Sequence, residues 1–144
     1  MGLATGETVS YETRSGKVYV FRSLGGKKVD LSTSGEADLA NAKTNATTNV
    51  TNHKTAVNAS KTIFTNRVTA LAGAPTRTHE IVDSFGATVT VNEYDISEGG
   101  ITKTFFVPLS DVSTASTSWE ANKTNVSLDQ THDDDLITAI AALA

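Results

Sequence analysis

The chain has 144 residues, a length typical of one domain, and its 38% apolar content and net charge of −4 exclude the class of disordered chains. Its 12 lysines and arginines are dispersed, which argues against a partner bound through nucleic-acid phosphates or through a membrane surface. The absence of cysteine excludes disulfides, thiolate catalysis and cysteine-ligated zinc.

The first third of the sequence has the pattern of β structure. Residues 8–13, 17–23 and 27–32 are short runs rich in Val, Tyr, Phe and Thr. Ser15-Gly16 and Gly25-Gly26 separate them as two-residue turns. This arrangement predicts a three-stranded antiparallel meander.

The apolar period then changes to that of a helix. Thr33 and Glu36 fit a capping box, and Gly73 and Pro75 supply a stop, which predicts a long helix over residues 36–71. An apolar residue recurs there every seven positions, at Val50, Val57, Phe64 and Leu71. The spacing predicts one apolar stripe that packs on the chain's own sheets or on a neighbouring copy.

The middle of this helix is rich in Thr and Asn, which are poor helix formers. A helix of that composition is marginal alone, so packing must hold it. The alternative is an irregular first half, with the helix proper starting near Asn49.

The β period returns over residues 79–84, 88–96 and 102–107. Turn sequences at 85–87 and 98–100 join these runs, and Pro108 ends the third. We expect a second three-stranded antiparallel meander.

Two short C-terminal helices complete the predicted chain. Thr117 and Glu120 form a second capping box, which opens a helix that runs to about Leu128. The acidic run 133–135 precedes a short amphipathic helix, at the end where the helix dipole favours negative charge. The fold class is therefore α+β: two meanders separated by a long helix, with short C-terminal helices. We expect a single domain over residues 1–144 in βββα-βββα order, with an internal duplication as an open alternative.

The densest group of possible metal ligands is Asp133, Asp134 and Asp135, with His132 beside them. The alternating ligands and glycine of an EF-hand are absent, so a solvated helix cap is favoured over a cation site. His53, His79 and His132 lie far apart without ligand spacing, and no GxSxG elbow is present. We expect no metal, no cofactor and no enzymatic activity.

Three aromatic residues are candidates for a binding patch: Phe105, Phe106 and Trp119. Adjacent residues in a strand point to opposite faces, so one of the two phenylalanines faces the core and the other faces outward. The outward ring indicates either a second packed layer or a protein interface, and both remain open.

The Thr/Asn/Ala-rich helix over residues 41–61, the glycine hairpins at 25–26 and 99–100, and the lack of cysteine resemble small tailed-bacteriophage virion proteins in composition. This resemblance implies a repeated capsid, decoration, tail or fibre subunit, located in the virion, with homo-oligomeric contacts. It transfers no functional residue.

The favoured function is therefore a structural or assembly subunit whose partners are other copies of itself and other structural proteins. A binding module for polar ligands or glycans, of the adhesin or receptor-binding type, is the alternative. We expect neither a nucleic-acid nor a membrane partner. The N-terminus lacks the basic and apolar regions of a secretion signal, and no apolar run reaches the length of a membrane span.

Overall fold

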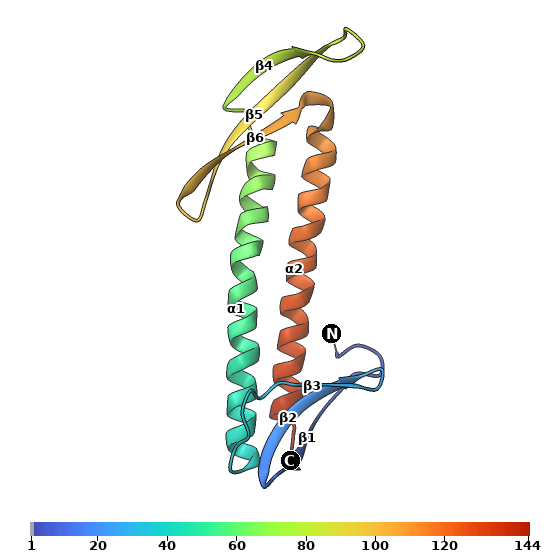
Figure 1. Cartoon of the computed structure of the whole chain (residues 1–144), viewed down its shortest axis with the longest axis vertical. Coiled ribbons are helices and arrows are strands. Elements are labelled where there is room, and N and C mark those ends of the chain that lie inside the picture. The colour runs from blue at the N-terminus through green and yellow to red at the C-terminus, as the bar shows by residue number, and fades with distance from the viewer. Residues whose placement is uncertain (1) are drawn as a thin grey trace. The chain divides into compact units, whose positions relative to one another are not determined.

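The computed structural model describes residues 2–144 and confirms the α+β class, with two three-stranded antiparallel sheets and long helices (Figure 1). Contacts divide the chain into two compact units. Unit 1 comprises Met1–Asn58 and Ser127–Ala144, and unit 2 comprises Ala59–Val126. Each unit contains one sheet and a segment of both helices. The single domain and the internal duplication stay predictions.

The sheet of unit 1 is the first predicted meander. It consists of β1 (Thr8–Arg14), β2 (Lys17–Leu24) and β3 (Lys27–Asp30), in that order. Ser15 and Gly16 both have positive φ, 51° and 78°, the backbone of a two-residue type I′ turn. The third strand ends earlier than residue 32, because the N–H groups of Leu31 and Ser32 both donate to Val20 O, at 2.8 and 3.2 Å.

The core of unit 1 lies where this sheet meets α1 (Leu39–Ala72) and α2 (Val112–Ala141). Val20, Ala42, Ala46 and Ile140 are 0% exposed. Alanine at two successive turns of α1 leaves little side chain between that helix and its neighbours, so the aliphatic groups of β2 and α2 fill the space.

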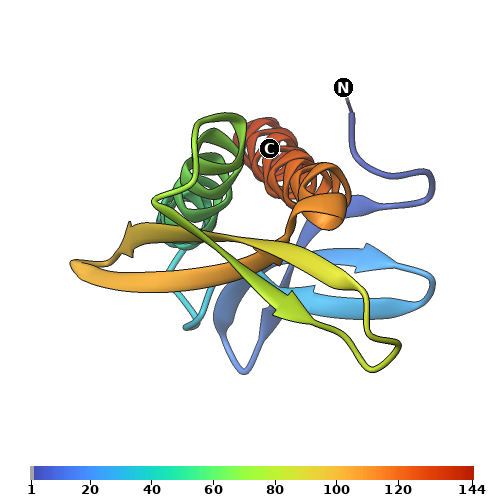
Figure 2. The ribbon, with the colours of Figure 1, turned by 90° about the horizontal axis from the view of Figure 1, so that it is seen from above.

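The sheet of unit 2 contains β4 (Arg77–Val82), β5 (Thr88–Glu98) and β6 (Ile101–Pro108), in the order β4-β5-β6. Figure 2 shows these strands side by side, coloured from green to orange. A 3₁₀ turn (Leu109–Asp111) connects β6 to α2. The core contains Leu71, Tyr94, Ile96 and Val107.

The predicted start of the long helix is wrong. Asp38 caps α1, since the N–H of Asn41 donates to Asp38 Oδ1 at 2.8 Å. Thr33 and Glu36 form no capping box, because the backbone of Glu36 pairs instead with Val18, at 2.9 and 3.0 Å.

The Thr/Asn-rich half of α1 is helical throughout, so the alternative start near Asn49 is also wrong. Packing holds it, because Ala42 and Ala46 are buried there. The hydroxyl of Thr44 donates to Ala40 O at 3.1 Å, within the same helix.

The two short C-terminal helices are one helix, α2, of 30 residues. The second capping box and the acidic run both lie in its interior. No Gly or Pro interrupts residues 112–141, and residues that resemble caps bond elsewhere. The hydroxyl of Thr131, for example, donates to Ser127 O at 3.1 Å.

Candidate functional site

The predicted apolar stripe of α1 is divided between the two units. Val50 is buried in the core of unit 1 and Leu71 in the core of unit 2. Val57, in unit 1, and Phe64, in unit 2, are half-buried.

Phe105 and Trp119 pack together in unit 2, with ring centroids 5.6 Å apart and planes at 78°. The guanidinium of Arg67 lies over both rings, at 4.8 Å from the first and 5.2 Å from the second. It also donates to both carboxylate oxygens of Glu98, at 2.6 and 3.1 Å. These aromatic residues therefore surround an ion pair whose carboxylate side chain is only 2% exposed.

Phe106 projects from the opposite face of the same strand and is 62% exposed. Its ring meets the edge of His79, with centroids 6.3 Å apart. The Nδ1 of His79 lies 3.1 Å from a carboxylate oxygen of Glu93 on the neighbouring strand.

Strand β4 is one edge of the unit 2 sheet, and all six of its residues are exposed, whereas the other edge, β6, contains buried and half-buried residues toward its end. Ile81 is 46% exposed and Val82 is 70% exposed. Phe85, in the loop that joins β4 to β5, is 94% exposed. The position of these residues at an edge could not be predicted, since a strand has the same sequence pattern at an edge and at the centre of a sheet.

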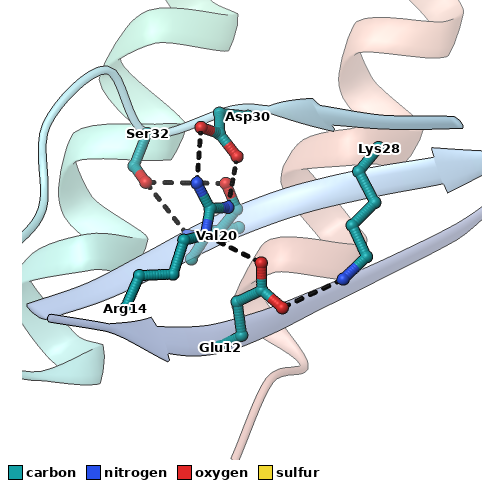
Figure 3. A network of polar contacts seen from close by, with 6 residues as sticks. All are labelled: Glu12, Arg14, Val20, Lys28, Asp30 and Ser32. Carbon is teal, nitrogen blue, oxygen red and sulfur yellow. Dashed lines mark hydrogen bonds and ion pairs between the residues drawn. The ribbon is translucent and has the colours of Figure 1, made fainter.

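One face of the unit 1 sheet carries a network of charged side chains. Arg14 donates to both oxygens of Asp30, at 3.0 and 2.6 Å, and to Glu12 at 2.7 Å (Figure 3). Lys28 donates to the other oxygen of Glu12 at 3.0 Å and lies 4.7 Å from the ring centroid of Phe21. Hydrogen bonds from Lys28 and Arg14 lower the pKa of the Glu12 carboxyl.

A groove of about 290 Å³ lies within unit 1, between the sheet and the two helices. Leu31, Val50 and Leu136 give it apolar lining. Its polar lining includes Arg22, His53, His132 and Asp133.

Two carboxylate–imidazole pairs flank this groove. His53 Nδ1 lies 2.6 Å from Asp133 Oδ2, and His132 Nε2 lies 2.7 Å from Glu7 Oε1. Both carboxylates are buried, since their side chains are 6% and 1% exposed. Both histidines thus line one groove although they are 79 positions apart in sequence. No local spacing could have predicted this, because it requires α2 to pack on α1.

Glu7 also accepts a hydrogen bond from Arg22 Nη1 at 2.8 Å. Burial alone would raise the pKa of Glu7, but hydrogen bonds from His132 and Arg22, together with the charge of the imidazole, lower the pKa overall. This carboxylate therefore remains ionised under the groove.

The predicted helix cap at the acidic run is wrong. Asp133 bonds to His53, and Asp134 accepts a hydrogen bond from Lys54 Nζ at 2.7 Å, so both aspartates connect α2 to α1. Among residues 2–144, no group of three or more His, Cys, Asp or Glu side chains is arranged to hold a metal ion.

No protein-family model matches this sequence, and no curated protein or solved structure is significantly similar to it. Within the described part of the chain, no helix combines the length and the apolar character that crossing a membrane requires.

Proposed function

We propose that this chain is a structural subunit that associates with a second copy of itself through the free edge of β4. The observation that carries the proposal is the edge itself, whose six residues are all exposed and include Ile81 and Val82. An uncovered strand with apolar side chains is a template for pairing with another strand.

The hydrogen bonds of the β4–β5 ladder define which backbone groups of β4 are free. The N–H of Asp83 donates to Ala87 O at 2.9 Å, which places this pair among the hydrogen-bonded pairs of the ladder. Such pairs alternate in an antiparallel ladder. The backbone N–H and C=O groups of Thr78, Glu80 and Val82 therefore point away from β5, toward a second strand.

The two edges of the other sheet, β1 and β3, differ from β4, since β1 has three half-buried residues and carries the charged Glu12 and Arg14. Strand β3 has only four residues and begins with Lys27 and Lys28. Short edges with lysine are poor templates for pairing. The contrast favours β4 as the self-association edge, and the exposed Phe85 at the end of the same hairpin would add apolar area to the contact. The place of such a subunit in a bacteriophage virion belongs to the proposal and rests on resemblance in composition.

The test is a proline substitution, Glu80→Pro, with Glu80→Thr as the matched control. Both variants remove the same carboxylate, but only proline removes the N–H that points to the free edge. A symmetric pair of copies loses two donors, each worth about 1 kcal/mol, which corresponds to roughly thirtyfold weaker association.

Light scattering after size exclusion, over a range of concentrations, measures the association. Wild type and Glu80→Thr are expected to have the same dimer dissociation constant. Glu80→Pro should already be monomeric at concentrations at which wild type is still a dimer. Far-UV circular dichroism of each variant checks that the sheet is intact. A monomeric wild type, or a proline variant that associates as wild type does, would contradict the proposal.

A further inference from the structure

The groove of unit 1 has unused hydrogen-bonding groups that the assembly proposal does not involve. His53 and His132 each bond to a buried carboxylate through one ring nitrogen. Among residues 2–144, Nε2 of His53 and Nδ1 of His132 have no bonding partner. A carboxylate on one nitrogen fixes the orientation of an imidazole, as it does in catalytic and metal-binding histidines. Both rings are therefore held in place at the groove.

The acidic groups at the groove are already occupied. Glu7 accepts hydrogen bonds from His132 and Arg22. Asp133 accepts a hydrogen bond from His53 when Nδ1 of that histidine carries the proton. Both oxygens of Asp30 are held by Arg14. The groove thus offers a cation few free ligands.

The groups that remain open favour an anion. Arg22 uses only Nη1 in its bond to Glu7, and its other nitrogens have no partner in the described chain. A guanidinium and two imidazoles that can be protonated form a suitable donor set for a carboxylate or a phosphate. The apolar lining of Leu31 and Leu136 suits the body of the same ligand.

We propose that this groove binds a small organic acid, with its carboxylate or phosphate at Arg22, His53 and His132 and its apolar part on Leu31, Val50 and Leu136. The volume of about 290 Å³ limits the size of the ligand. It equals the space of roughly ten water molecules, which accommodates a short-chain carboxylic acid or a small phosphate monoester.

Binding of the acid depends on pH through the two imidazoles. Between about pH 5 and 8, histidine is the side chain whose charge ordinarily changes. With neutral rings, Glu7 and Asp133 oppose an anion, whereas protonated rings offset both carboxylates and donate to the ligand. The charged groups around the two rings come from every neighbouring element: Glu7, Arg22, Asp30 paired with Arg14, Asp133, and Lys54 paired with Asp134.

The test measures binding of three probes to the full chain: hexanoate, phenyl phosphate and inorganic phosphate. Binding is followed by ¹H–¹⁵N NMR titrations at about pH 5.5 and about pH 8, between which the charge of histidine ordinarily changes. The double variant His53→Gln/His132→Gln removes the proposed donors. His79→Gln is the matched control, because His79 also pairs with a carboxylate but lies in unit 2.

We expect one of the two organic probes to bind at least about tenfold more tightly at the lower pH, and to shift the amides of Asn49 and Val50. The double variant should lose the pH dependence and most of the affinity, whereas His79→Gln should bind as wild type does. Binding of hexanoate alone identifies a carboxylate site, and binding of phenyl phosphate alone a phosphate site. If the double variant does not fold, His53→Gln alone serves, since it leaves the Glu7 pair intact.

No saturable binding of either organic probe at the lower pH overturns the proposal. So does binding that the histidine variants leave unchanged, or that shifts amides outside the groove. Because the readout is ligand binding at unit 1, the outcome is independent of whether the chain self-associates through β4.

Discussion

Replacing Arg67 by methionine tests whether the ion pair with Glu98 stabilises unit 2. The guanidinium contacts both oxygens of that carboxylate and lies over the rings of Phe105 and Trp119. Its side chain is 20% exposed and that of Glu98 is 2% exposed. Methionine keeps an unbranched apolar stem in contact with the rings and removes only the charge and its donors.

The expected cost follows from the exposure of the two partners. Removing one partner of a buried ion pair costs about 3–5 kcal/mol, because the other charge stays buried without compensation. Lys103 remains 3.1 Å from Glu98 Oε2, but its side chain is 52% exposed, so it recovers at most about 1 kcal/mol. The free energy of unfolding should therefore fall by about 2–4 kcal/mol in Arg67→Met.

A double-mutant cycle separates the ion pair from the packing of the stem. Glu98→Gln alone should cost less, about 1–2 kcal/mol, because the partly exposed Arg67 retains contact with water. The double variant Arg67→Met/Glu98→Gln has no buried charge left. Its loss should be smaller than the sum of the two single losses by at least about 1 kcal/mol.

Urea unfolding measures these losses. Trp119 is the only tryptophan of the chain and lies against Arg67, so its fluorescence follows unit 2 directly. Circular dichroism follows the helices at the same time. A loss below about 1 kcal/mol in Arg67→Met, or additive losses in the double variant, would show that Lys103 and solvent already compensate the carboxylate.

Two further predictions concern pH and close packing. The pKa values of Glu7 and Glu98 are lowered in the folded chain, so their contribution to stability is full above the usual glutamate pKa of about 4.3 and is lost as the pH falls through the folded pKa values. The urea midpoint of unfolding should therefore drop between about pH 5 and pH 3. A midpoint that rises on acidification would contradict this. Gly35→Ala should lower the free energy of unfolding by about 1–3 kcal/mol, measured by thermal or urea unfolding, because a Cβ there would lie 2.6 Å from Cβ of Lys17. Gly73→Ala is the control, since the nearest atom to its added Cβ would be 3.7 Å away, and it should change the free energy of unfolding little.

The strands of this fold could be predicted well from sequence because their information is local. Runs of β-branched and aromatic residues between glycine-containing turns specify each hairpin, and the positive φ of Gly16, Gly26 and Gly100 shows the backbone that those glycines permit. Only the strand ends differ, by one or two residues. The separation into two sheets was not readable, since alternation specifies hairpins and not the contacts between them.

The helix boundaries were harder because Thr, Ser, Asn and Asp occur throughout the sequence. A capping box is informative when such residues are rare, whereas here Thr33 and Thr117 match it by composition. The actual cap of α1 is Asp38, which has no Glu or Gln three positions later. The merging of two predicted helices into α2 has the same origin, because Asp133 was interpreted as a cap and is in fact bonded to α1.

The groove was not predictable, because each of its polar pairs joins residues distant in sequence. Glu7 and His132 are 125 positions apart, and His53 and Asp133 are 80 apart. The spacing of the three histidines gives no sign that two of them lie close together. Only the packing of α2 against α1 and the N-terminal segment places both rings at one cavity.

Each unit has a small apolar core and a buried glutamate beside it, and the partners of that glutamate determine how the unit responds to pH. In unit 2, Glu98 is held by Arg67 and Lys103, whose charges do not change near neutrality. In unit 1, Glu7 is held by Arg22 and by His132, and histidine is the side chain that titrates between about pH 5 and 8. Over that range the partners of the buried glutamate can therefore change charge in unit 1 but not in unit 2, where His79 pairs with Glu93 and not with Glu98. Trp119 lies against Arg67, the partner of Glu98, so its fluorescence should stay constant between about pH 5 and 8.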